Sequence, residues 1–385
     1  RVRPAPRRPE TEQTVAPPTD VAEIKIVFSD VHLGPGEHPG LANPYEDFRQ
    51  DDRLAEMIRH YAEGPHAAIP VEIVINGDFM DLLKVPIGGR FLAEVSEEAA
   101  VEKVRRVLRG HPRVFDALAA FLRVPDHRIT CIPGNHDVEI AFPAAQHLIR
   151  ARLDALDGPE RLVFHVEQDT LRLPRGVVVT HGHNFEAMNR IDPGRSIVPG
   201  PDGRPIANLP FGSRFLIHAL LPYKAEQPLL DQVHPLSTFL LWGLVFDLRF
   251  TLKLLWRMAT FLFATRLSRS AMQEVGWFKT LQILVEEVSL FTNMERRAVK
   301  VLRESDDISA LVVGHNHAAR IARFPRNKVY VNTGTWLKIV SLELRDLGTR
   351  NYLTYAQIEY RPVGPPAVRL MRWRGRAREM EELMA

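Results

Sequence analysis

The chain has 385 residues, of which 45% are hydrophobic and 25% charged, with a formal net charge of +3 and a pI of about 9.0. These values are ordinary for a soluble globular protein, and the length suffices for one large domain with an insertion or for two domains. The single cysteine, Cys131, excludes an intrachain disulfide and fits a reducing compartment, so we expect a cytoplasmic location.

Strands and helices alternate along most of the chain. Residues 1–20 are rich in Pro and Arg and lack apolar periodicity, so we expect them to be disordered. Strands are predicted at 24–29, 71–75, 128–132, 161–166 and 176–180, with helices at 47–63, 94–109, 112–123 and 143–154. Further strands are predicted at 309–313, 319–324, 328–332, 336–343, 352–360 and 367–373. This order indicates an α/β (α+β) fold, a mixed-sheet core covered by helices, over 21–183 and 307–385.

Residues 184–306 interrupt this alternation and form a predicted helical insertion. Its first part is Pro/Gly-rich and loop-like, and its last part, 271–304, has the pattern of an amphipathic helix that returns to the core. The stretch 236–267 is the most apolar of the chain. The longest uncharged run, Gln232 to Phe246, is short for a transmembrane span.

A basic stripe accompanies the apolar residues of the insertion. Arg249, Lys253 and Arg257 recur every four residues and therefore share one helical face, while Phe246, Phe250 and Leu254 lie on other faces. This combination is typical of a helix that lies in a membrane interface, so 236–267 is predicted to contact a membrane surface. A cap packed on the core, or a dimer interface, is the alternative, and the oligomeric state is not predicted.

Polar side chains follow five of the apolar strands. They are Asp30 and His32, Asp78, Asn135, His181, and His315 with His317. Such positions converge at the carboxyl ends of strands, where α/β active sites form. The set mixes carboxylate, imidazole and carboxamide groups without a thiolate, which suits two divalent ions that share a bridging carboxylate.

The five motifs, SDVH, GDFMD, GNHD, HGH and GHNH, resemble in their order and strand context the signature of the calcineurin-type metallophosphoesterases. The resemblance covers about 24–183 and 307–345. It implies a four-layer sandwich of two mixed β-sheets flanked by helices, interrupted here by the large apolar insertion. It also implies a hydrolase of phosphate esters or pyrophosphates with two divalent metal ions, Mn first and Fe or Zn as alternatives.

The resemblance also implies a role for each motif residue. Asp30, His32 and His317 would bind the first metal, and Asn135, His181 and His315 the second. Asp78 would bridge the two and share the water that becomes the attacking hydroxide. His136 would stabilise phosphoryl charge or protonate the leaving oxygen, and Asp137 would orient its ring.

Five further residues are candidates for substrate contacts. Asp81 could orient a neighbouring side chain, serve as an extra ligand or begin a helix. His183 could bind the substrate phosphate or brace its loop. Asn184, Arg190 and Arg195 could bind a polar head group. Trp336 fits the core better than a ligand contact.

The insertion is the part of the sequence that indicates the substrate class. It enters between two loops of predicted ligands, so both its ends are expected to lie beside the site. The forms SDVHLG and GDFMDLL resemble the UDP-2,3-diacylglucosamine hydrolase branch, which commonly has Arg where this chain has His136. We therefore expect a phosphohydrolase for a lipid-like substrate, peripheral on the inner face of the membrane. The alternatives are a soluble phosphodiesterase or phosphatase for nucleotides or phosphoproteins, and a non-catalytic metal-binding scaffold. No nucleic-acid partner is expected, since no basic cluster with interleaved aromatic residues borders the motifs.

Overall fold

The computed structural model describes residues 20–37, 43–230, 233–234, 236–267, 291–341, 348–375 and 381–382. Apart from residue 20, the segment predicted to be disordered lies outside the described residues. Positions 271–290 of the helix predicted over 271–304 also lie outside them.

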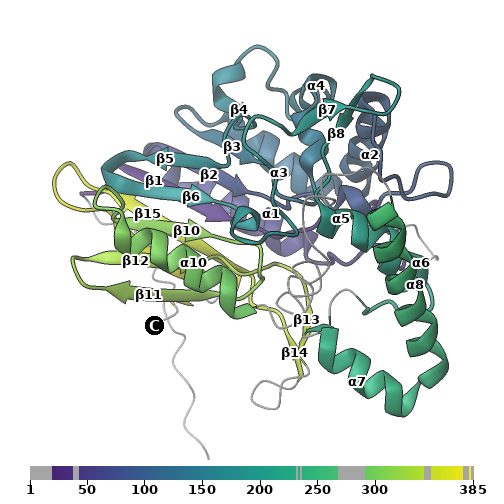
Figure 1. Ribbon diagram of the computed structural model, residues 1–385. Coiled ribbons are helices and arrows are strands. Elements are labelled where there is room, and N and C mark those ends of the chain that lie inside the picture. The colour runs from purple at the N-terminus through teal and green to yellow at the C-terminus, as the bar shows by residue number, and fades with distance from the viewer. Residues whose placement is uncertain are drawn as a thin grey trace, which may run out of the picture.

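A large mixed sheet forms one half of the core (Figure 1). Its strands follow the order β17-β16-β15-β1-β2-β3-β4. Their bounds are β1 Glu23–Phe28, β2 Val71–Asn76, β3 Arg128–Ile132, β4 Leu162–Phe164, β15 Thr354–Tyr360, β16 Ala367–Arg372 and β17 Glu381–Glu382. Strands β1 to β4 are parallel, and β15 pairs antiparallel with β1. The carboxyl ends of β1, β2 and β3 therefore lie along one edge.

The second sheet joins the two halves of the chain that the insertion separates. Its order is β11-β12-β10-β6-β5. The bounds are β5 Thr170–Leu173, β6 Val177–Thr180, β10 Ala310–Val313, β11 Arg320–Phe324 and β12 Lys328–Asn332. Because β6 and β10 are parallel neighbours, the residues that follow them meet despite the more than one hundred residues between them.

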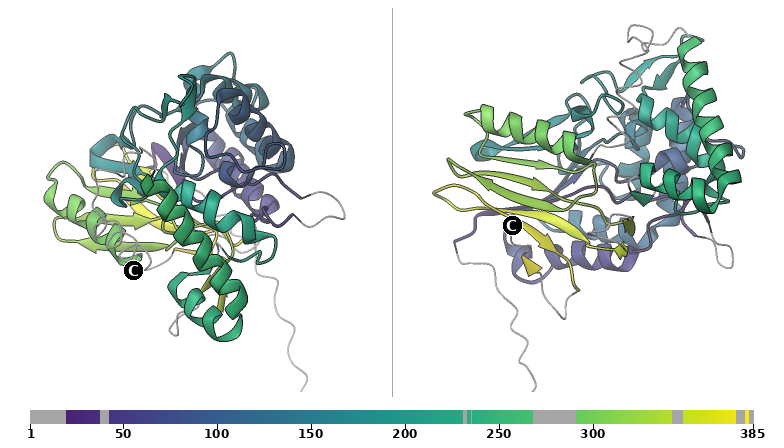
Figure 2. Two further views of the ribbon diagram at one scale, coloured as in Figure 1. Left: turned by 45° about the vertical axis from the view of Figure 1, so that its right-hand side comes forward. Right: turned by 60° about the horizontal axis from the view of Figure 1, so that its bottom comes forward.

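Both faces of each sheet are buried, so the two sheets and the helices on their outer faces form four layers. Val27 and Ile132 of the first sheet share a core with Val179 and Val312 of the second. Helices α1 Asp51–Ala62, α2 Glu97–Gly110, α3 Pro112–Arg123 and α4 Pro143–Arg152 cover the outer face of the first sheet, and α10 Phe291–Glu304 covers that of the second. Figure 2 shows these helix layers on opposite sides of the sheets. The predicted sandwich of two mixed sheets flanked by helices is thus confirmed.

Short helical turns connect these elements. They are η1 Gly64–Ala68, η2 Leu82–Lys84, η3 Val138–Ala141, η4 Pro159–Arg161, η5 Pro174–Gly176 and η6 His183–Phe185.

The insertion is largely helical, with a hairpin where only a loop was predicted. Its elements are β7 Ile197–Pro199, β8 Pro205–Ala207, α5 Phe211–Phe215, the π-helical turn η7 Leu216–Leu220, α6 Leu221–Lys224, β9 Val233–His234, α7 Leu236–Phe246 and α8 Leu248–Leu267. Strand β9 pairs with β13 Ile339–Ser341, and β13 pairs with β14 Gly348–Arg350. The strand predicted over 336–343 is thus shorter, and Trp336 is fully buried ahead of it.

Helix α8 packs against the hydrophobic core through residues that we expected to face a membrane. Phe250 and Leu254 are buried against the core, so their assignment to a membrane-facing surface is wrong. Lys253 pairs with Glu226, and Arg257 donates a hydrogen bond to the carbonyl of residue 218, so these two cations bind the insertion itself. Among the described residues, no helix has both the length and the apolar character needed to cross a bilayer.

Candidate metal centre

The five motifs meet at one edge of the two sheets. Asp30, Asp78 and Asn135 follow β1, β2 and β3 of the large sheet, while His181 and His315 follow β6 and β10 of the second. Parallel strands present their carboxyl ends at a common edge of their sheet, and the packing of the two sheets brings the two sets of loops together. The side chains of all five are buried or nearly so.

Backbone strain is concentrated at the predicted ligands. Five of them adopt left-handed conformations, with φ of 54° at Asp30, 55° at His32, 51° at Asp78, 73° at His315 and 60° at His317. Residues other than glycine rarely adopt this backbone conformation. It persists only where the surrounding structure imposes it, commonly at functional sites.

Two motif glycines allow the loops to approach each other. A Cβ at Gly134 would overlap the Asp78 carboxylate and lie 2.6 Å from the Asp78 backbone nitrogen. Gly77 has a φ of 82°, and a Cβ there would overlap the imidazole of His181. The glycine in GDFMD and the one in GNHD are therefore required by packing between the loops.

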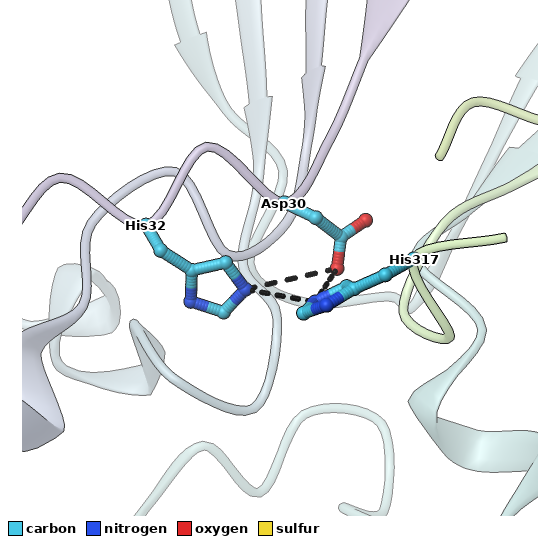
Figure 3. A group of neighbouring side chains, drawn as sticks. All are labelled: Asp30, His32 and His317. Carbon is cyan, nitrogen blue, oxygen red and sulfur yellow. Dashed lines mark hydrogen bonds and ion pairs between the residues drawn. The ribbon is translucent and has the colours of Figure 1, made fainter. Parts of the chain in front are cut away.

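Asp30, His32 and His317 form the first group of potential ligands (Figure 3). His317 Nε2 lies 3.3 Å from Asp30 Oδ1 and 3.1 Å from His32 Nε2, and His32 Nε2 is 3.9 Å from Asp30 Oδ1. One donor atom from each residue lies within 4.8 Å of the others, close enough for all three to contact one cation.

Asp78, His181 and His315 form a second group within the same limit. His181 Nδ1 donates to the carbonyl of Asn76 at 2.8 Å, which directs Nε2 toward Asp78 Oδ2, 3.2 Å away. Asp78 also belongs with His32 and His136 to a third group that lies between the other two. Its carboxylate is therefore central to the whole set.

The buried donor atoms fit divalent cations. Asn135 Oδ1 and His315 Nδ1 are buried and have no hydrogen-bond partner among the residues that the structure describes. Burial disfavours the charged form of Asp78, but His181 and His136 hold the pKa of its carboxyl well below the usual range. A buried carboxylate among imidazoles and a carboxamide is the donor set of a hard or borderline cation, and the clusters accommodate two.

His136 is oriented by Asp81 and not by Asp137. His136 Nδ1 lies 3.0 Å from Asp81 Oδ1, and burial is outweighed by Asp81 and Asp78, which raise the pKa of His136 to about 9. The Asp137 carboxylate instead accepts from the backbone N–H groups of Gly134 at 2.7 Å and Phe79 at 2.8 Å. The predicted role of Asp137 is therefore wrong. It ties the GNHD and GDFMD loops together, and the sequence could not distinguish two acids equally close to the motifs.

The structure adds two residues that we did not predict. Glu186 Oε2 lies 2.8 Å from His315 Nε2, and Asn189 Nδ2 lies 3.4 Å from the same nitrogen, which leaves Nδ1 of His315 for a metal. Carboxylates commonly hold a metal-binding imidazole in this way. The only sequence signal was their position shortly after the HGH motif.

The residues predicted to contact substrate at the start of the insertion do not join the group of potential metal ligands. Asn184 donates to Asp169 and accepts from the backbone of residue 191, so it braces its loop. Arg190 and Arg195 are exposed, with Asp192 at 3.8 and 4.0 Å. His183 is buried behind His181 and lines a separate small cavity with Asn184.

A cavity of about 270 Å³ opens onto the centre. Asp78, Asn135, His136 and both histidines of the GHNH motif line its polar side, together with Lys84 and Lys338. The other residues named here are apolar and come mainly from the insertion. They are Phe215, Leu216, Leu220, Leu230 and Val233, with Leu337 and Ile339 beside them.

Comparisons with known proteins find similarity only among solved structures. No family model and no curated protein matches the chain. A dimetal phosphatase from Danio rerio aligns with 94% of this chain and 99% of its own, at 12% identity and a TM-score of 0.39. A predicted phosphoesterase from Streptococcus pneumoniae aligns with 94% of this chain and 96% of its own, at 11% identity and a TM-score of 0.28. Zinc-complexed Vps29 from Entamoeba histolytica aligns with 94% and 97%, at 10% identity and a TM-score of 0.28. At these values the likeness assigns no activity, and the function rests on the site's own residues.

Proposed function

We propose that this protein is a dinuclear metallophosphoesterase that hydrolyses a phosphate ester or pyrophosphate bond in a lipid-like substrate. The observation that carries the proposal is the convergence of Asp78 and the six other predicted ligands at one edge of the sheets, with His136 held by Asp81 in the same cavity. The motifs resemble the calcineurin-type signature in order and strand context, which supports the same reaction class.

Each group of residues would have a distinct task. Asp30, His32 and His317 would hold one cation, and Asn135, His181 and His315 the other, with Asp78 shared. When bound, two such ions lower the pKa of water and neutralise phosphoryl charge. Asp81 fixes Nδ1 of His136 and leaves Nε2 to donate a hydrogen bond or a proton to the leaving oxygen.

The apolar side of the cavity supports a substrate with a hydrocarbon part. Phe215, Leu216 and Leu220 of α5 and η7 face the same space as Asn135 and His136. A phosphate at the ligands would thus place one substituent against apolar side chains, where burial of hydrocarbon is favourable.

A second apolar face of the insertion supports docking on a bilayer. Leu252, Trp256 and Phe263 are more than half exposed on α8, opposite the buried face, and Val245 and Phe246 are about three-quarters exposed at the end of α7. The one acid between the helices, Asp247, accepts from the backbone N–H of Phe250. Helix α7 packs against β9, which contributes Val233 to the cavity. Figure 1 shows α7 projecting away from the sheets.

Substrate class is tested by hydrolysis with purified protein loaded with Mn. Phospholipids, nucleotide-linked lipids and nucleotides should be compared, and His136→Ala serves as the control with intact metal binding and slow turnover. We expect turnover of the lipid-like esters. Turnover of nucleotides alone would favour the soluble phosphodiesterase, and metal binding without any turnover would favour a non-catalytic scaffold.

Membrane docking is tested by flotation with anionic vesicles. The double variant Val245→Ser/Phe246→Ser removes two exposed apolar side chains, each of which would contribute about 1.5 kcal/mol or more when buried in lipid. We expect at least a tenfold weaker partition, whereas Val363→Ser, an exposed valine on the β15–β16 connection, should bind like the wild type. A wild-type protein that stays with the soluble fraction, or a variant that changes only the oligomeric state, contradicts docking.

A further inference from the structure

One peptide group of the GNHD loop joins the candidate metal centre to the insertion. Its N–H, which belongs to His136, donates to Asp78 Oδ1 at 2.8 Å. Its carbonyl, which belongs to Asn135, accepts from the hydroxyl of Ser213 at 2.8 Å. Because a peptide group is planar, the two bonds together fix its orientation. The position of a predicted ligand, Asn135, and the position of His136 both depend on this group.

The bond between the insertion and the GNHD loop is buried. Ser213 is 1% exposed and Asn135 is 3% exposed, so water has little access to the hydroxyl or to the carbonyl. A buried carbonyl that loses its donor is unfavourable. The hydroxyl of Ser213 is therefore needed to keep the loop in place.

Packing within the insertion determines where the Ser213 hydroxyl lies. Ser213 is the middle residue of α5, and the rings of Phe211 and Phe215 lie with centroids 5.5 and 5.8 Å from that of Phe261 on α8. Residues four apart share one side of a helix, so both phenylalanines hold the same side of α5 against α8. Ser213, two positions from each, lies on the other side, where it meets the GNHD loop.

The preceding residue, Gly212, contacts the support of another predicted ligand. Its N–H donates to the carbonyl of Met188 at 2.8 Å, and a Cβ at Gly212 would overlap the amide oxygen of Asn189. Asn189 donates at 3.0 Å to Glu186 Oε2, the carboxylate oxygen that lies beside His315. Two consecutive residues of α5 thus support two predicted ligands of the second metal.

The first group of predicted ligands is held by the core. Asp30 accepts from the backbone N–H of His315 at 2.9 Å, and its carbonyl accepts from the Thr335 hydroxyl at 2.6 Å. His32 Nδ1 lies 3.4 Å from Asp81 Oδ2. These partners lie outside the insertion, so a change in α5 should affect the second metal more than the first.

We propose that Ser213 is a positioning residue of the metal centre, through which the insertion forms part of the second metal site. The inference rests on the proposed function, because it concerns the same pair of ions. Ser213 acts through the peptide group that carries Asn135, and not as a ligand. Loss of such an indirect partner typically weakens metal binding by about 10- to 100-fold.

Titration of the metal-free protein with Mn²⁺, followed by EPR spectroscopy, tests this role. The signal of free Mn²⁺ gives the affinity for each ion, and two bound ions that share Asp78 give a magnetically coupled spectrum. In Ser213→Ala we expect the first ion to bind as in the wild type and the second about tenfold more weakly. The coupled spectrum should then require more Mn²⁺. Ser213→Cys, which carries a weaker donor, should show a smaller loss of the same kind.

Thr251→Val is the matched control. The Thr251 hydroxyl is also buried in the insertion and donates to a carbonyl at 2.8 Å, but this carbonyl belongs to Asp247 of the insertion itself. Each variant therefore removes one buried hydroxyl from the insertion. We expect Thr251→Val to bind both ions like the wild type, which separates positioning of the ligand from a general loss of stability.

Two results overturn the positioning role. One is a coupled spectrum that forms in Ser213→Ala at the Mn²⁺ concentration of the wild type, and the other is equal weakening in Ser213→Ala and Thr251→Val. Hydrolysis of bis(p-nitrophenyl) phosphate is measured on the same samples. A metal pair that responds to Ser213→Ala without any turnover would count against the phosphoesterase function alone, whereas a wild type that binds a single Mn²⁺ would contradict both.

Discussion

Replacement of Lys224 by Met should disturb both the stability of the protein and its catalytic centre. Lys224 lies at the end of α6 with a side chain 1% exposed, and its Nζ bonds Asp47 Oδ1 and the carbonyl of Pro228, each at 3.0 Å. The other oxygen of Asp47 pairs with Lys84, and Lys84 Nζ lies 2.9 Å from Asp81. A buried chain of charges therefore links the insertion to the carboxylate that orients the catalytic histidine.

The expected magnitude follows from this burial. Removal of one partner from a buried ion pair typically destabilises a protein by about 3–5 kcal/mol, because the remaining charge stays desolvated. Since Asp47 retains Lys84, we expect the low end, a loss of about 3 kcal/mol in the free energy of unfolding. Lys84 would also be drawn toward Asp47 and away from Asp81, so kcat should fall while KM changes little.

Urea unfolding and steady-state kinetics on matched variants provide the assay. Lys253→Met removes an equally long cation from α8, but its pair with Glu226 is about half exposed and screened by water, so the change in stability should be far smaller. Asp47→Asn combined with Lys224→Met should recover part of the stability, because no carboxylate is then left without its second cation. Equal losses for Lys224→Met and Lys253→Met, with kcat unchanged, would refute this reasoning.

Three further results are expected. Asp78→Ala should lose at least one bound metal per chain and nearly all hydrolysis, and elemental analysis that finds two ions at wild-type occupancy contradicts the bridging role. His136→Ala should keep its metals yet turn over on the order of 100-fold more slowly, and metal loss would make His136 a ligand. Burial disfavours charge on His111, but Asp51 and Glu46 raise its pKa to about 9. The protonated form is thus favoured in the folded state. His111 should therefore add about 3 kcal/mol to the free energy of unfolding below pH 6.5, and this contribution should be lost as the pH rises through 9. Urea unfolding should show this slope in the wild type, and a slope that persists in His111→Gln contradicts it.

Much of the fold and the ligand set could be predicted because the signals are local. Strands buried on both faces read as continuous apolar runs, so β2 and β3 were found almost residue by residue. The polar residues after those runs must lie at strand ends. Parallel pairing within each sheet and the packing of the two sheets then bring them together, as the distances among Asp30, His32 and His317 show.

The sequence alone thus determined the sandwich, the order of the motifs and the residues available to bind metal. The tertiary structure decided which carboxylate serves which histidine, since Asp81 and Asp137 are equally near the motifs and only the path of the loops separates them. It also decided which apolar face of α8 is buried. Periodicity places residues on a common face but does not say which face meets the core, and Leu254 is buried while Trp256 is exposed because of what packs beside the helix. Pairing of Lys224 with Asp47 across 177 positions has no local signal either, because such contacts exist only once the insertion has folded onto the core.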